Sequence, residues 1–166
     1  DCLYLAYQGN KLSDRPDAVY CMMLNLECND VALEDIMQNG VAELDQFDAF
    51  MELWIEYLGT CEERTAKKLI LEAQSLLNDS KKALEIAKKY VTKHPALYEQ
   101  YLTQSMGKGN AAEFFEEGWE ALTKLPHKFV TRSCIALLTA ENALQIQKFD
   151  EAEQCWLEAF RSETNC

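Results

Sequence analysis

The segment KFDEAEQCWLEAF, from Lys148 to Phe160, combines small and large apolar residues at helical spacing. Ala152 and Ala159 are seven residues apart with Trp156 between them, so the three share one side of an α-helix. Such a side could line an active site, hold a ligand in a groove, or pack on a neighbouring helix. Because no ionisable residues converge on it, we interpret it as packing. The alanines let the helix over 130–145 approach closely, and Trp156 fills the space beside them.

The rest of the chain also predicts helices. Its 166 residues include three prolines and six glycines, which fall between segments with apolar residues at spacings of three and four. Alternating runs of β-branched residues are absent from the sequence, so it offers no candidate strands. The predicted fold class is all-α.

The N-terminal third predicts three helices. Pro16 suits the first turn of one, and a short helix is expected between Asp30, as its N-cap, and Gly40. The clearest amphipathic pattern in the chain runs from Phe47 to Leu58. The apolar face of that helix requires a packing partner.

From Glu62 onward the predicted helices form pairs. We expect three helix-turn-helix units, at about 62–94, 95–125 and 127–162. In the second helix of the first unit, Ala83 takes the position that Ala152 takes in the third. The expected organisation is therefore an acidic helical region, 1–61, packed on the three units of 62–166.

These units resemble tetratricopeptide repeats. In that family a small residue opens the second helix, a larger apolar residue and a second alanine follow, and a proline often stands past the helix end. The matches are Ala152, Trp156 and Ala159 in the last unit, Ala83 and Pro95 in the first, and Ala121 and Pro126 in the second. Equivalent positions are 31 residues apart from Pro95 to Pro126 and 38 apart from Ala121 to Ala159, against about 34 in the family. The resemblance implies an α-α superhelix, a divergent solenoid of antiparallel helix pairs.

The resemblance also implies a binding surface, because the first helices of such a solenoid line one concave face. The residues expected there are Thr65, Lys68, Glu72, Glu99, Thr103, Cys134, Leu137, Glu141 and Gln145. The basic and asparagine residues that clamp a terminal carboxylate in some family members are not assembled. The glutamates of this set favour an internal or basic peptide segment instead. Alternatively, the face packs on the rest of a longer chain.

The charge of the chain narrows the class of partner. The net charge is −12, and the whole excess lies between Asp1 and Glu63, where there are fourteen acidic and two basic residues. An acidic surface repels phosphate backbones, so the expected partner is a basic peptide or protein and not a nucleic acid. Lysines cluster between Arg64 and Lys93. They predict a solvated helix flank, or else a flank that attracts the acidic third of this chain or of a second copy, with phosphate binding as a third option.

Residues typical of catalysis are few. His94 and His127 each stand beside a proline at a predicted helix end, where the helix dipole favours a cation or the ring faces water. Neither belongs to a zinc-binding motif. Adjacent carboxylates such as Glu116 and Glu117 diverge on a helix. We therefore predict a chain that is not an enzyme and needs no metal or cofactor.

Other features bear on location and completeness. No apolar run reaches the roughly 18 residues of a membrane span, and seven cysteines are scattered without paired spacing. These features predict a protein of the reducing cytoplasm, without membrane contact. The chain begins at Asp1 and ends at Cys166 directly after a patterned helix. We expect a fragment of a longer protein, with a further helix after Cys166.

The sequence thus predicts a non-catalytic interaction or scaffolding module that binds a peptide or protein segment on a concave helical surface. The alternative is a regulatory or sensor domain of a larger protein that binds an effector peptide or small molecule. A sensor predicts a closed apolar pocket, and a catalytic helical domain, the third option, predicts convergent ionisable groups in a cleft. The three tryptophans are expected to pack between helices, with Trp119 the candidate for an exposed anchor.

Overall fold

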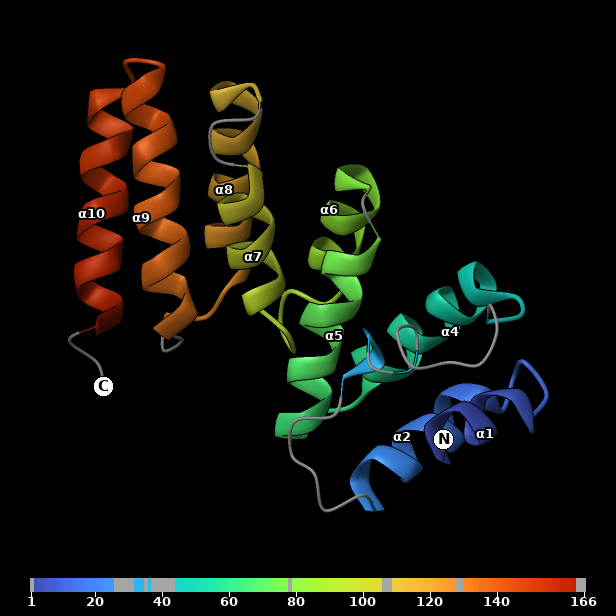
Figure 1. Ribbon diagram of the computed structural model, residues 1–166. Helices are drawn as coiled ribbons and strands as arrows, with labels where there is room; N and C mark the ends of the chain where they lie inside the picture. Colours follow the sequence, from blue (N-terminus) through green and yellow to red (C-terminus); the bar gives the residue numbers. More distant parts are fainter. Residues whose placement is uncertain are drawn as a thin grey trace. The chain divides into compact units, whose positions relative to one another are not determined.

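The computed structural model of the chain describes residues 2–25, 32–34, 36, 44–77, 79–105, 109–127 and 130–163. All regular secondary structure in these ranges is helical (Figure 1). The helices are α1 (Cys2–Gln8), α2 (Arg15–Asn25), α4 (Phe47–Thr60), α5 (Arg64–Leu76), α6 (Ser80–Lys89), α7 (Ala96–Ser105), α8 (Ala111–Lys124), α9 (Val130–Gln145) and α10 (Phe149–Glu163). The predicted all-α class is confirmed. Within the described residues, each helix is too short or too polar to cross a bilayer.

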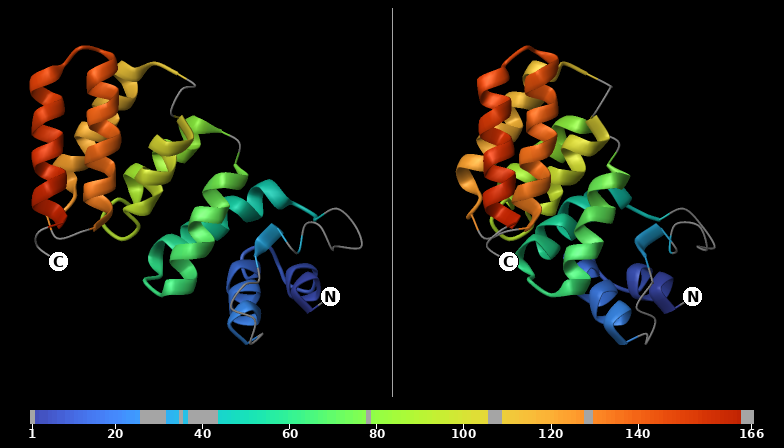
Figure 2. Two further views of the ribbon diagram at one scale, coloured as in Figure 1. Left: turned by 60° about the vertical axis from the view of Figure 1, so that its left-hand side comes forward. Right: turned by 90° about the vertical axis from the view of Figure 1, so that its left-hand side faces the viewer.

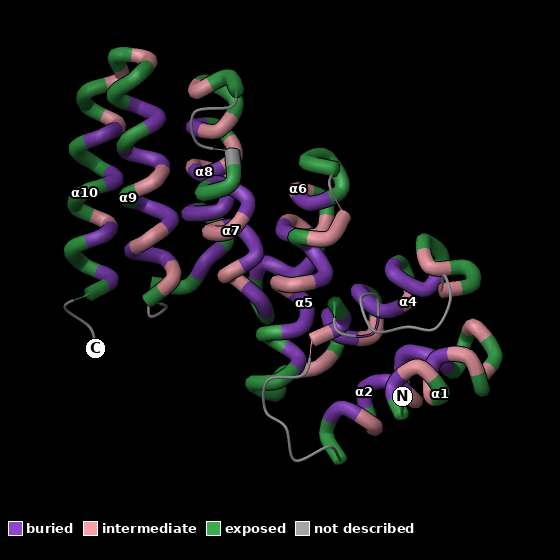
Figure 3. The backbone as a smooth tube through the Cα atoms, viewed as in Figure 1, coloured by how far each residue is buried: buried purple, intermediate pink, exposed green. Residues whose placement is uncertain are grey.

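The chain divides into two compact units, Asp1–Leu76 and Leu77–Cys166. α5 therefore belongs to the N-terminal unit and α6 to the C-terminal unit, although the sequence predicts them as one pair. Both units contain helices with buried faces (Figure 3). The boundary that the sequence predicts between the acidic region, 1–61, and the helix-turn-helix units of 62–166 stays a prediction.

Aromatic residues form much of the core of the N-terminal unit. Tyr7, Phe50 and Trp54 are fully buried. The rings of Phe50 and Trp54 stack with centroids 5.7 Å apart, and Tyr7 meets Phe50 edge-on at 4.8 Å. Both geometries are favoured for aromatic pairs. The amphipathic pattern of α4 thus buries the side that the sequence predicts.

Local signals place several helix ends. Pro16 lies in the first turn of α2, as predicted. Asp79 caps α6 by accepting from the backbone N–H groups of Lys81 and Lys82. The short helix predicted between Asp30 and Gly40 lies largely outside the described residues, although its members Leu33 and Ile36 are described and buried.

α9 lies at the centre of the C-terminal unit. It packs against α7, α8 and α10, and α7 also packs against α6 and α8. α9 and α10 stand side by side as an antiparallel hairpin (Figure 2). The buried face of α10 includes Ala152 and Ala159. Because α9 is the main neighbour of α10, these alanines lie in the helix interface that the sequence predicts.

α8 and α9 meet closely at Gly118. A Cβ atom at this position would lie 2.1 Å from Oγ1 of Thr139, well inside any van der Waals contact. Thr139 is fully buried, and its hydroxyl donates to the carbonyl of Ile135 at 2.7 Å. The hydroxyl is thereby held in place, so the observed helix spacing depends on glycine at position 118.

Two expectations from the sequence are wrong in this unit. The first is that Trp156 fills the space beside the alanines, because Trp156 is 47% exposed. Successive helical residues are about 100° apart, which puts position 156 roughly 50° round the helix from the midpoint of Ala152 and Ala159. The second is the alternative, one of two for His94, that its ring faces water. His94 is buried, and its ring packs edge-on against Tyr90 with centroids 6.3 Å apart.

Candidate functional site

The residues predicted for the concave surface divide between the two units. Thr65, Lys68 and Glu72 lie on α5 in the N-terminal unit, and the other six lie on α7 and α9 in the C-terminal unit. Glu72 accepts hydrogen bonds from the backbone N–H groups of Leu33 and Glu34, at 3.1 and 2.9 Å. This carboxylate is therefore already engaged inside its own unit.

α7 and α9 bring part of the predicted set together. Cys134 on α9 lies near Glu99 on α7, and burial, aided by the charge of Glu99, raises the pKa of this thiol. Thr103 instead donates to the carbonyl of Glu99 in its own helix, at 2.7 Å. The exposed members of the set on α9 are Leu137, Glu141 and Gln145.

α9 and α10 carry most of the exposed large apolar residues. Of nine such residues in the described part of the chain, seven lie on these two helices. Six of the seven, here termed the outer patch, are Val130, Leu137, Leu144, Phe149, Trp156 and Phe160. Exposed apolar clusters are typical of interaction sites, whereas single exposed apolar residues are not. The sequence prediction contains only Leu137 of this patch.

The outer patch continues from one helix to the other. α9 and α10 run antiparallel from a turn near Gln147, so residues equally far from that turn lie level with each other. This relation puts Leu137 level with Trp156, and Leu144 level with Phe149. The residues of the outer patch are therefore spread along both helices of the hairpin, and they are also called the apolar band below.

Carboxylates flank the outer patch. Glu141 on α9 and Glu153 and Glu163 on α10 are exposed. Of the basic residues at the two ends of α10, Lys148 pairs with Glu116 at 3.2 Å and Arg161 lies on the pocket side, where it pairs with Glu158 at 3.0 Å. The surface around the patch is consequently acidic.

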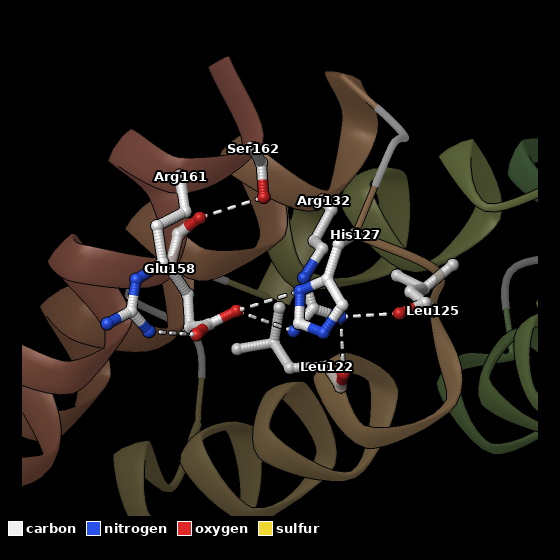
Figure 4. A network of polar contacts seen from close by, with 7 residues as sticks. All are labelled: Leu122, Leu125, His127, Arg132, Glu158, Arg161 and Ser162. Atoms are coloured by element: carbon white, nitrogen blue, oxygen red, sulfur yellow. Dashed lines mark hydrogen bonds and ion pairs between the residues drawn. The ribbon is translucent and has the colours of Figure 1, made fainter. Parts of the chain in front are cut away.

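A polar network lies where α8 ends beside α9 and α10 (Figure 4). The carboxylate of Glu158 accepts hydrogen bonds from Nη2 of Arg132 at 2.8 Å and from Nη1 of Arg161 at 3.0 Å. Nδ1 of His127 lies 3.4 Å from the same carboxylate. The hydrogen bond from Arg132 is the main cause that lowers the pKa of Glu158, and burial opposes it. Glu158 is thus held in its ionised form.

Arg132 connects this network to the end of α8. Its Nη1 donates to the carbonyl of Leu122 and, at 2.6 Å, to that of Leu125. The last carbonyls of a helix have no partner within the helix, and a cation at that end also interacts favourably with the helix dipole. The side chain of Arg132 is only 5% exposed. One buried side chain therefore joins α8, α9 and α10.

The network borders a pocket of about 490 Å³. Residues of α8, α9, α10 and the segment between α8 and α9 line it. They are Trp119, Leu122, Thr123, His127, Arg132, Gln154, Cys155, Leu157, Glu158 and Arg161. Trp119, the predicted candidate for an exposed anchor, is half-buried here.

Two ionisable groups of this pocket have shifted pKa values. Burial raises the pKa of Cys155 to about 11, so the thiol is neutral at pH 7 and a poor nucleophile. Glu158, held by two guanidinium groups, is a weak base. Within the described residues, no group of three or more histidine, cysteine or carboxylate side chains is placed to hold a metal ion.

The sequence prediction misses the residues of this network. His127 is noted only as a helix-end residue, and Arg132, Glu158 and Arg161 are not singled out. One signal was available. Arg132 is the only charged residue in the stretch Val130–Ala140, which is otherwise apolar or weakly polar. Charged residues are buried only when they are paired, so an isolated arginine in such a stretch indicates a buried ion pair.

Comparison with known proteins adds no identification: no family model, no curated protein and no solved structure matches the chain.

Proposed function

We propose that the chain is a non-catalytic interaction module, built as a tetratricopeptide-like solenoid, that binds a basic amphipathic helix on the outer patch. The observation that carries the proposal is the concentration of exposed apolar residues on α9 and α10. The solenoid is supported by the contacts of α9 with its partner α10 and with both helices of the preceding pair, α7 and α8. In a helical array each unit buries its apolar stripe against its neighbours in this way.

The chemistry of the surface defines the partner. An apolar band favours a helix with its own apolar stripe, and the flanking Glu141, Glu153 and Glu163 favour lysine or arginine beside that stripe. The band from Val130 to Leu144 spans about 21 Å, which corresponds to a partner helix of about 14 residues. The proposed partner is therefore still the basic peptide segment predicted from the sequence. Its proposed binding surface shares Leu137 with the predicted concave surface.

Fluorescence polarisation with defined peptides tests this proposal. The probe is a labelled 14-residue helix with leucine on one face and lysine on the other, and the control peptide carries glutamate in place of lysine. We expect the basic peptide to bind and the acidic peptide to bind at least about tenfold more weakly. Trp156→Ser should weaken binding by about tenfold or more, because aromatic residues dominate interface energies.

Leu24→Ser is the matched control variant, since Leu24 is an exposed leucine on α2, far from the patch in sequence. It should bind the basic peptide as the native chain does. Equal losses in Leu24→Ser and Trp156→Ser, or equal binding of both peptides, would contradict the proposal.

A regulatory or sensor domain is the second candidate function. The pocket beside Glu158 favours it, because a sensor requires a site for a small effector. This pocket is lined by charged as well as apolar residues, which differs from the closed apolar pocket expected from the sequence.

A further inference from the structure

The pocket beside Glu158 has a surplus of positive charge. Its charged lining consists of two guanidinium groups, from Arg132 and Arg161, and one carboxylate, from Glu158. His127 adds a further cation when it is protonated. In a chain with a net charge of −12, this pocket therefore has the opposite sign to the molecule as a whole.

The buried arginine also has an unused donor. A guanidinium carries five N–H groups in a fixed fork. Nη1 and Nη2 of Arg132 donate to Leu122, Leu125 and Glu158, but Nε is buried and has no hydrogen-bond partner. Buried donors nearly always have partners, and this unsatisfied donor belongs to an arginine that lines the pocket.

The remaining lining of the pocket is partly apolar, with polar side chains from Thr123 and Gln154. Its large apolar side chains are Trp119, Leu122 and Leu157. The pocket volume of about 490 Å³ lies within the roughly 300–1,000 Å³ of small-molecule sites. The side chains of Arg161 and His127 are 66% and 71% exposed, so a ligand can reach both from solvent.

We propose that this pocket binds a small organic anion with a flat apolar body, of the aryl carboxylate or aryl sulfonate class. Trp119 and Leu157 contact the apolar body. Arg161 and His127 bind the anionic group, and Nε of Arg132 provides the buried donor. This site goes beyond the proposed binding of a basic helix and does not depend on it.

A pair of fluorescent probes tests the proposal. The anion is 8-anilinonaphthalene-1-sulfonate, and the neutral probe is N-phenyl-1-naphthylamine, which has the same aromatic body without the sulfonate. We expect the sulfonate to bind in a 1:1 ratio and at least about tenfold more tightly than the neutral probe. Arg161→Gln should weaken sulfonate binding by about tenfold and leave the neutral probe unchanged. In ¹⁵N-labelled native protein, the Nε–H signal of Arg132 should shift as the sulfonate is added.

Two control variants locate the probe. Arg64→Gln removes the same charge from an exposed arginine on α5 in the other unit, and it should leave both affinities unchanged. Trp156→Ser changes the outer patch and should also leave them unchanged. The proposal is overturned if the sulfonate fails to bind, if Arg161→Gln has no effect, or if Trp156→Ser removes binding, since the probe would then occupy the outer patch. None of these results tests the proposed binding of a basic helix, which the peptide assay measures separately.

Discussion

Arg132 illustrates at the residue scale how one charged side chain can hold three helices together. Its guanidinium satisfies two carbonyls at the end of α8 and pairs with Glu158 on α10. A buried ion pair contributes little net stability compared with apolar residues of the same shape, but loss of one partner leaves an uncompensated charge. Removal of the Glu158 carboxylate should therefore lower the free energy of unfolding by more than the ion pair contributes to it.

We expect Glu158→Gln to lower the free energy of unfolding by about 2 kcal/mol at pH 7. Glutamine keeps the shape of the side chain but removes the negative charge that Arg132 and Arg161 bind. Urea unfolding measures the change. Glu153→Gln, on the exposed face of α10, is the matched control and should change stability by less than about 0.5 kcal/mol.

The same pair predicts a pH dependence. The pKa of Glu158 is lowered in the folded state, chiefly by the hydrogen bond from Arg132, from the ordinary value of 4.5. Its contribution to stability is therefore complete above the unfolded-state pKa and is lost as the pH falls through the folded-state pKa. The stability difference between the native chain and Glu158→Gln should shrink below about pH 4.5. A difference that stays constant down to pH 3 would exclude this account.

Cysteine reactivity is a second test at this scale. Cys155 is fully buried and its pKa is raised to about 11 by burial, whereas Cys2 and Cys21 are exposed. Because the thiolate is the reactive form, Cys155 should be alkylated at pH 8 at least about a hundredfold more slowly than Cys2 or Cys21. Timed iodoacetamide labelling with peptide mass spectrometry measures the rates. In urea the rates should become similar, and equal rates in the folded chain would contradict the burial of Cys155.

At the scale of elements, helix spacing depends on side-chain size at single positions. Gly118 lets α8 approach Thr139 of α9, and Ala152 and Ala159 lie buried on the side of α10 that packs on α9. Small residues at these contacts permit a short interaxial distance. The helix pattern around position 118 predicts α8, but it does not indicate which neighbouring helix comes close.

Gly118→Ala should destabilise the chain despite the better helix propensity of alanine. The new Cβ would overlap Thr139, and overpacking costs about 1–3 kcal/mol, while the propensity gain is about 1 kcal/mol. In a Thr139→Ala background the clash with Oγ1 is absent, so the cost of Gly118→Ala should fall by about 1 kcal/mol or more. Chemical unfolding of the four proteins of this double-mutant cycle measures the coupling. Additive changes would show that the two side chains do not limit the helix spacing.

At the scale of the whole molecule, charge and exposed apolar surface oppose each other. A net charge of −12 keeps copies of the chain apart, and the outer patch favours their association. The lysine flank predicted to attract the acidic N-terminal third has a different observed contact at Lys88. This lysine pairs with Glu117 and Glu120 of α8, at 2.6 and 3.1 Å.

We therefore expect salt to promote self-association. Raising the salt concentration from about 0.05 M to about 0.5 M screens the repulsion between acidic copies and leaves the apolar attraction. Sedimentation velocity should show larger species at the higher concentration, and Trp156→Ser should remove the increase. Dissociation at the higher salt concentration would instead support contact between the acidic third and the lysine flank.

The sequence by itself determined the all-α class and most helix positions, because these depend on local apolar periodicity and on Pro16. It also determined that Ala152 and Ala159 face a neighbouring helix. Only the tertiary structure showed that Trp156 is exposed, that His94 is buried and that Arg132 meets Glu158. These outcomes depend on which helices become neighbours. A contact between residues 26 positions apart, such as Arg132 and Glu158, cannot be predicted from the apolar periodicity of either helix. For the same physical reason, the pocket and the outer patch could be recognised only after α8, α9 and α10 were packed together.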